Sequence, residues 1–250
     1  MSEKGLGSQL KEIGEVVGSK VAILALGKRW WVVGPEGAGK TTFHSALVGI
    51  EDLGIHSPTI GRAETAGGTT LSKTRSGDIS TRRVKSSSDV GGHVMYWDVW
   101  SEALTPSVDR LVFLYDLSDV SHGANAWQNL EAAFDAACEA IEDRYAPKGK
   151  VWRRKPRART LLVMANKADV WSEKPPPSQF DGNHFPKPEI YSQALDLMKT
   201  RAGQMTGLVG VQPIWTWGSV SKNQPWYPSF EAILERVESH EPSRWAWRRR

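Results

Sequence analysis

The stretch that decides the fold reads Gly34-Pro35-Glu36-Gly37-Ala38-Gly39-Lys40-Thr41-Thr42. It matches the pattern G-x-x-x-x-G-K-[ST] of a phosphate-binding loop. The apolar run from Trp30 to Val33 predicts a buried strand before the loop, and the spacing from Thr42 to Val48 predicts a helix after it. Such a loop turns successive backbone N–H groups toward a phosphate, and the helix N-terminus adds partial positive charge. We therefore expect a nucleoside triphosphate to contact Gly34, Glu36, Gly37, Ala38, Gly39, Lys40, Thr41 and Thr42.

Two side chains of this loop carry chemistry in addition to binding. The Lys40 ammonium is expected to bridge the β- and γ-phosphates, which makes it a candidate catalytic residue. The Thr41 hydroxyl is expected to be a ligand of Mg²⁺. The cofactors predicted from this loop are therefore a nucleoside triphosphate and Mg²⁺.

A second motif, Asn166-Lys167-Ala168-Asp169, selects the base. The apolar stretch from Arg159 to Ala165 predicts a buried strand that ends at this motif. Asp169 can accept two hydrogen bonds from the N1–H and N2–H₂ groups of guanine, whereas adenine offers no matching pair of donors. The Lys167 stem can cover the base. Asn166 can tie the loop at 166–169, the base loop, to the phosphate loop. The predicted nucleotides are GTP and GDP.

These motifs resemble a small Ras-like GTPase, most closely the Arf branch, over about residues 28 to 240. Ser57-Pro58-Thr59-Ile60-Gly61 is similar to the family's switch I, and Tyr96-Trp97-Asp98-Val99 to its W-D-V strand end. The segment from Leu111 to Asp119 resembles the next strand with its acidic exit. Ser219-Val220-Ser221 resembles the S-A-K loop, whose backbone N–H contacts guanine O6. The resemblance implies that Asp98 holds Mg²⁺ through a water and that Ser219 and Val220 contact the base.

The chain departs from this family at switch II, which reads D-x-x-G-Q in the family. After Asp98, the glycine that senses the γ-phosphate is replaced by Ser101 and the water-orienting glutamine by Glu102. A carboxylate that faces a triphosphate is repelled, so Glu102 is a poor catalytic substitute for an amide. Glu36 also crowds the region of the γ-phosphate. We expect slow hydrolysis that needs an arginine from a partner, or no hydrolysis.

Two threonines compete as the switch I ligand of Mg²⁺. Thr59 has the Arf-like context, but a long segment then separates it from Asp98. Gly67-Gly68-Thr69-Thr70 instead resembles the G-T-T switch of bacterial GTPases of tRNA modification and ribosome assembly. We favour Thr70 because the two glycines permit the mobility that a switch needs, and we keep Thr59 as the alternative.

The order of elements predicts an α/β fold with three layers, in which helices cover both faces of a mainly parallel sheet. Ligands of such a sheet bind at the C-terminal edge of its strands, where the two motifs are expected. The 250 residues, 40% of them apolar, are enough for one large domain. We predict an N-terminal helical extension at 1–27, a GTPase domain at 28–240, and a basic tail at 241–250. Insertions are expected at about 63–92, 146–159 and 171–188.

The net charge and the cysteine content indicate the cellular compartment and the kinds of partner to expect. A net charge of +4 is too small to favour nucleic acid, and one cysteine with a polar N-terminus predicts a cytoplasmic protein. The basic loop at 146–159 and the N-terminal helix could contact a membrane surface peripherally. The proline-rich insertion at 171–188 is a candidate docking surface for a protein effector or for subunits of a complex.

Three functions compete at this point. The first is a Mg²⁺-dependent GTP-binding switch, with slow or partner-assisted hydrolysis of GTP to GDP, that controls assembly with a protein partner. The second is a hydrolysis-deficient pseudo-GTPase that acts as a nucleotide-bound scaffold subunit, which Ser101 and Glu102 favour. The third, an ATP-dependent enzyme, requires the motif at 166–169 to be coincidental.

Overall fold

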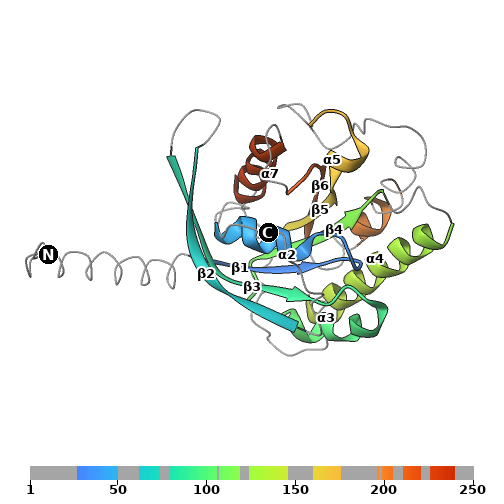
Figure 1. Ribbon diagram of the computed structural model, residues 1–250. Helices are drawn as coiled ribbons and strands as arrows, with labels where there is room; N and C mark the ends of the chain where they lie inside the picture. The colour runs from blue at the N-terminus through green and yellow to red at the C-terminus, as the bar shows by residue number, and fades with distance from the viewer. Residues whose placement is uncertain are drawn as a thin grey trace, which may run out of the picture.

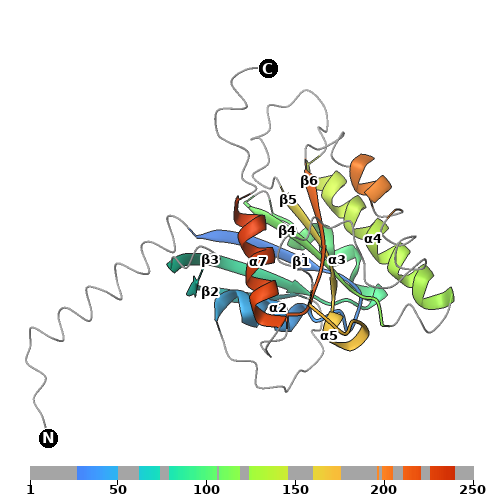
Figure 2. The same ribbon diagram turned by 90° about the horizontal axis from the view of Figure 1, so that it is seen from above.

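The computed structural model describes residues 27–49, 62–73, 79–105, 107–118, 124–145, 160–175, 196, 199–204, 211–220 and 226–239. Its centre is a six-stranded sheet in the order β2-β3-β1-β4-β5-β6, and helices cover both faces (Figures 1 and 2). The predicted three-layer α/β fold is confirmed.

Five of the six strands run parallel. They are β1 (Lys28–Val33), β3 (Ile79–Val90), β4 (Arg110–Asp116), β5 (Thr160–Asn166) and β6 (Gln212–Trp217). Every residue of β4 and β5 is buried, as expected for central strands covered on both faces. The sixth strand, β2 (Arg62–Lys73), pairs antiparallel with β3 and forms one edge of the sheet.

One helical layer consists of α2 (Lys40–Val48) and α7 (Trp226–Ser239). Phe43 of α2 packs between Trp30 of β1 and Phe230 of α7, with ring centroids 6.3 Å and 5.5 Å apart. These contacts fix the helix that follows the phosphate loop against the strand that precedes it.

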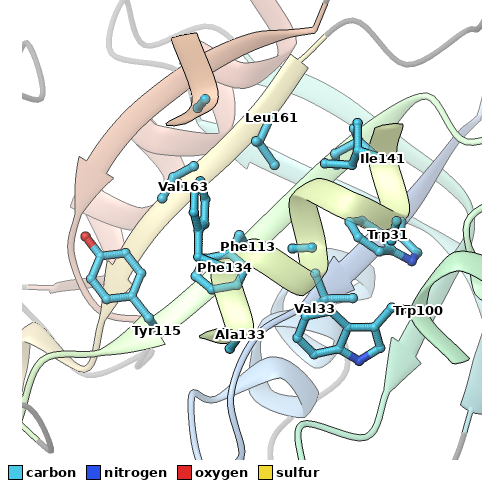
Figure 3. Packing of buried hydrophobic residues seen from close by; sticks show 14 of the residues in the cluster. Trp31, Val33, Trp100, Phe113, Tyr115, Ala133, Phe134, Ile141, Leu161 and Val163 are labelled. Carbon is cyan, nitrogen blue, oxygen red and sulfur yellow. The ribbon is translucent and has the colours of Figure 1, made fainter. Parts of the chain in front are cut away.

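The other layer contains α3 (Asp98–Ala103) and α4 (Ala124–Tyr145). Figure 3 shows its core, in which Trp31, Trp100, Phe113 and Phe134 belong to one buried cluster. A short 3-10 helix, η1 (Val94–Tyr96), leads into α3, and α5 (Ala168–Trp171) follows β5. Cys138 of α4 is half-buried against this core, and burial raises its pKa to about 12, so the thiol stays protonated at neutral pH.

The segment predicted as an insertion at 63–92 is instead part of the sheet. β2 and β3 pair from Arg62 opposite Val90 to Lys73 opposite Ile79, and β3 also pairs with β1. The predicted insertion therefore overlaps an edge hairpin, which accepts polar residues more readily than a central strand does.

A buried ion-pair network ties this hairpin to the C-terminal helix. The Arg82 guanidinium of β3 lies 3.0 Å from Glu231 and 2.7 Å from Glu238, both on α7. Burial acts to lower the pKa of Arg82, but Glu238 and Glu231 outweigh it and the pKa is raised. A buried guanidinium without these carboxylates would be strongly destabilising, so the network sets where β3 lies relative to α7.

Several predicted segments lie outside the described residues. They include nearly all of the N-terminal extension at 1–27, the loop at 146–159, most of the insertion at 171–188, and the tail at 241–250. Thr59 lies outside as well. Among the helices that are described, none combines the length and the apolar character needed to cross a bilayer.

Candidate nucleotide-binding site

The phosphate loop joins the buried end of β1 to the first turn of α2. Gly37 and Gly39 have φ angles of 76° and 86°, in the left-handed region that favours glycine. Gly39 is the N-cap of α2 and has no side chain that could form a capping hydrogen bond. Thr41 lies exposed in the first turn. The positive end of the helix dipole is thus presented to an anion, as a phosphate site requires.

Lys40 crosses the inside of this loop. Its ammonium donates hydrogen bonds to the carbonyl oxygens of Gly34, at 3.1 Å, and Pro35, at 2.9 Å. The residue is buried, so these carbonyls hold the charge in one place rather than leaving it in solvent. The loop therefore combines a fixed cation with a helix N-terminus, which is a suitable cradle for a phosphate chain.

The Asn166 side chain joins three loops. Its Nδ2 donates to the carbonyl oxygen of Ala38 at 2.8 Å, and its Oδ1 accepts the backbone N–H of Val220 at 3.1 Å. The tie between base loop and phosphate loop expected from the sequence is thus present. Gly39 is required here too, since a β-carbon on it would lie 2.5 Å from Asn166 Nδ2. The N–H of Val220, assigned by resemblance to guanine O6, is engaged with Asn166 in this arrangement.

The base loop is held at both of its ends. Lys167, with a φ of 54°, has its Nζ 2.9 Å from Oδ2 of Asp116, which is buried at the end of β4. At the other end, the Trp171 indole donates to the carbonyl oxygen of Asn166 at 2.9 Å and its ring packs on Trp217. Asp169, between these anchors, is exposed and accessible to a base.

Asp116 is a site residue that sequence reasoning did not single out. Its second carboxylate oxygen accepts the N–H of Ser118 at 2.9 Å and the Ser118 hydroxyl at 2.6 Å. The signal was present in the sequence, because Asp116 ends an apolar strand at the same edge as the other motifs. Its pairing with Lys167 depends on β4 and β5 being neighbours, which the sequence alone did not establish.

The structure contradicts the strand end predicted at 96–99, on which the assignment of Asp98 and Glu102 to switch II rested. β3 ends at Val90, and Asp98 is instead the exposed first residue of α3, with Glu102 exposed on the same helix. The residues that leave β3 are Asp89-Val90-Gly91-Gly92-His93, which match D-x-x-G with a histidine after the glycine. Asp89 pairs with Val32 in the register of the sheet, so its backbone lies at the edge that carries the phosphate loop.

Gly92 lies directly against the phosphate loop. A β-carbon at this position would collide with the backbone of Pro35 and Glu36 and with the ammonium of Lys40. Only glycine allows this close approach. The W-D-V sequence at 97–99 favoured Asp98 over Asp89 as the start of switch II. The pair Gly91-Gly92 after an aspartate was the signal that could have found it.

Comparison with known proteins supports this arrangement at the level of the fold. No family model matches the sequence, and no curated protein matches it either. Among solved structures, the signal recognition particle receptor SRb-GTP/SRX complex from Chaetomium thermophilum contains a chain that superposes with a TM-score of 0.53. The chain has the fold of a small GTPase. Sequence identity is 13%, and the match covers 84% of this chain and 97% of the other.

Within this small-GTPase fold, Thr70 does not come near Thr41. β2 begins at Arg62 beside Val90, at the phosphate edge, and Thr70 lies opposite Arg82 further along the same strand. At about 3.3 Å per residue, the eight residues from Arg62 to Thr70 span roughly 26 Å. The register thus contradicts our preference for Thr70, while Thr59, three positions before Arg62, is outside the described residues.

Proposed function

We propose that this chain is a Mg²⁺-dependent GTP-binding switch that hydrolyses GTP to GDP slowly. The observation that carries the proposal is the Asn166 side chain, which bonds the phosphate loop through Ala38 and the base-side loop through Val220. One buried amide therefore couples the two ends of an elongated ligand site. The small-GTPase fold gives that site its position at the C-terminal edge of the strands.

The residues divide the ligand between them. Asp169 accepts from the guanine edge and the Lys167 stem covers the base. Lys40 and the N-terminus of α2 hold the phosphates. The Thr41 hydroxyl would supply a hard oxygen donor for Mg²⁺, and by their places in the sequence Asp89 and Thr59 are candidates for the two switch ligands. Bound Mg²⁺ neutralises charge on the phosphate oxygens.

We assign to His93 the water-orienting position, which the sequence alone had suggested for Glu102. Its Nδ1 accepts the backbone N–H of Met95 at 3.3 Å, so a neutral imidazole carries its proton on Nε2. Nε2 is then a hydrogen-bond donor, suited to orienting a water or a phosphate oxygen rather than to accepting a proton. With His93 in this role, Ser101 and Glu102 no longer bear on hydrolysis, and the pseudo-GTPase stays as the alternative. Slow turnover rests instead on Glu36, whose backbone nitrogen lies against Gly92 and whose carboxylate disfavours a further negative charge.

The same segment offers a surface for a protein partner. Val94 and Met95, which directly follow His93, have 61% and 73% of their surface exposed. Because they adjoin the residues next to the third phosphate, their position would change with the nucleotide. The SRb structure that shares the fold is a complex with SRX. We propose that a protein effector binds here, while membrane contact and a cytoplasmic location remain predictions.

Replacing His93 tests the proposed hydrolysis. His93→Ala is expected to lower single-turnover phosphate release from GTP by at least about tenfold, because the donor that orients the attacking water is lost. Glu102→Ala is the matched control and should leave the rate unchanged, since Glu102 is exposed on α3. A large loss in Glu102→Ala with none in His93→Ala would contradict the assignment. Undetectable hydrolysis by the unmodified chain would favour the scaffold alternative.

A further inference from the structure

Two tryptophans donate hydrogen bonds to consecutive carbonyl groups of the loop that follows β3. The Trp100 indole Nε1 lies 3.1 Å from the carbonyl oxygen of Gly91, and the Trp97 indole Nε1 lies 3.1 Å from that of Gly92. The two rings also contact each other, with centroids 5.8 Å apart at 44°. An indole N–H can only donate, so both contacts have a defined direction.

Each of these hydrogen bonds fixes the orientation of a whole peptide group. In a planar trans peptide, the C=O of one residue and the N–H of the next point in opposite directions. Trp100 therefore turns the N–H of Gly92 away from itself, and Trp97 does the same for the N–H of His93. Gly92 lies against Pro35, Glu36 and the Lys40 ammonium. The two peptide groups that the tryptophans hold, which meet at Gly92, thus lie next to the phosphate loop.

The loop needs such support because of its composition. Gly91 and Gly92 have no β-carbons, and ordering a glycine backbone costs more conformational entropy than ordering any other residue. Trp100 is fully buried in the cluster with Trp31 and Phe113 (Figure 3), so its indole is a rigid anchor. Trp97 is partly buried and packs against the same cluster. A loop already held in place loses less entropy when a ligand binds to it.

We propose that Trp97 and Trp100 are positioning residues that pre-orient the Gly92 and His93 amides toward the third phosphate. The pair, the tryptophan clamp, acts through the backbone of the loop and touches no nucleotide itself. Its effect is selective: it strengthens the binding of a nucleoside triphosphate and leaves the diphosphate unaffected. This inference rests on the proposed function, since it requires that guanine nucleotides bind.

The test compares two affinities in one variant. Trp97→Phe keeps an aromatic ring in a partly buried position and removes the N–H donor together with part of the ring surface. The dissociation constant for a non-hydrolysable GTP analogue is expected to rise about three- to tenfold, the worth of one hydrogen bond, while that for GDP stays unchanged. Trp100→Phe should show the same selectivity. Trp127→Phe, also partly buried against this core, is the matched control and should change neither value.

Each result decides the matter. An unchanged ratio of the two dissociation constants in Trp97→Phe would overturn the tryptophan clamp, whether both affinities fall equally or neither changes. Thermal melting of each variant separates a loss of folding from a loss of selectivity, and Trp97→Phe is expected to melt close to the unmodified protein. Failure of the unmodified chain to bind any guanine nucleotide would overturn the proposed function, and the clamp with it.

Discussion

Asp169→Asn is expected to weaken GTP binding at least about 100-fold and to create binding of xanthosine triphosphate. The Asp169 carboxylate, exposed in the first turn of α5, would accept two hydrogen bonds from guanine. Each charge-assisted hydrogen bond contributes about 1.5–3 kcal/mol, so losing both gives an effect of this size. Xanthine has a carbonyl in place of the guanine amino group, so the Asn amide can donate to it. Calorimetric titration of both nucleotides measures the change.

The matched control for this change is Glu173→Gln. Glu173 is also an exposed acidic residue and lies two residues after the end of α5, so it tests whether a lost charge alone has an effect. It should alter neither GTP nor xanthosine triphosphate binding. Asp169→Asn could instead retain its GTP affinity within about twofold, which is less than a single hydrogen bond contributes. In that case the base would not be recognised by this residue.

Asn166→Ala should lower the free energy of unfolding by about 2–4 kcal/mol and abolish detectable nucleotide binding. The substitution leaves the buried Ala38 carbonyl and the Val220 N–H without their partner, and each unsatisfied buried group costs about 1–3 kcal/mol. It also disconnects the phosphate loop from the base loop. Urea denaturation and nucleotide titration give the two values.

Thr160→Val is the control from the same strand. Its hydroxyl is buried at the opposite end of β5 and has no hydrogen-bond partner within the part of the chain that the structure describes. Removing it should be neutral or stabilising, because an unsatisfied buried hydroxyl is unfavourable. An Asn166→Ala protein as stable as Thr160→Val would mean that the three loops are held together by other contacts.

The parts of the fold that the sequence predicts are those governed by local pattern. β1 and β5 follow from apolar runs, α2 from helical spacing, and the phosphate loop from fixed positions of glycine and lysine. The bond from Asn166 to the phosphate loop could be expected because both motifs end strands of one parallel sheet. These features need no knowledge of how distant segments pair.

The features that the sequence missed depend on pairing between distant residues. β3 carries Arg82 and Ser87 in buried positions, so its sequence lacks the apolar pattern that indicates a buried strand. Thr70 could be excluded only from the register of β2 against β3, a tertiary property. The end of β3 at Val90 is what leads us to propose Asp89 and His93 as the switch residues. The tryptophan clamp likewise depends on tertiary structure, because Trp97 and Trp100 reach the Gly91-Gly92 pair only when the segment after it folds back.

Titration of the unmodified chain with GTP, GDP and ATP, each with Mg²⁺, tests most directly whether one site grips both guanine and phosphates. The account predicts saturable one-to-one binding of GTP and GDP, with ATP weaker by at least about 100-fold because adenine cannot satisfy the Asp169 carboxylate. Equal affinities for ATP and GTP would contradict the base assignment. The absence of any binding heat with either guanine nucleotide, at several temperatures, would contradict the site itself.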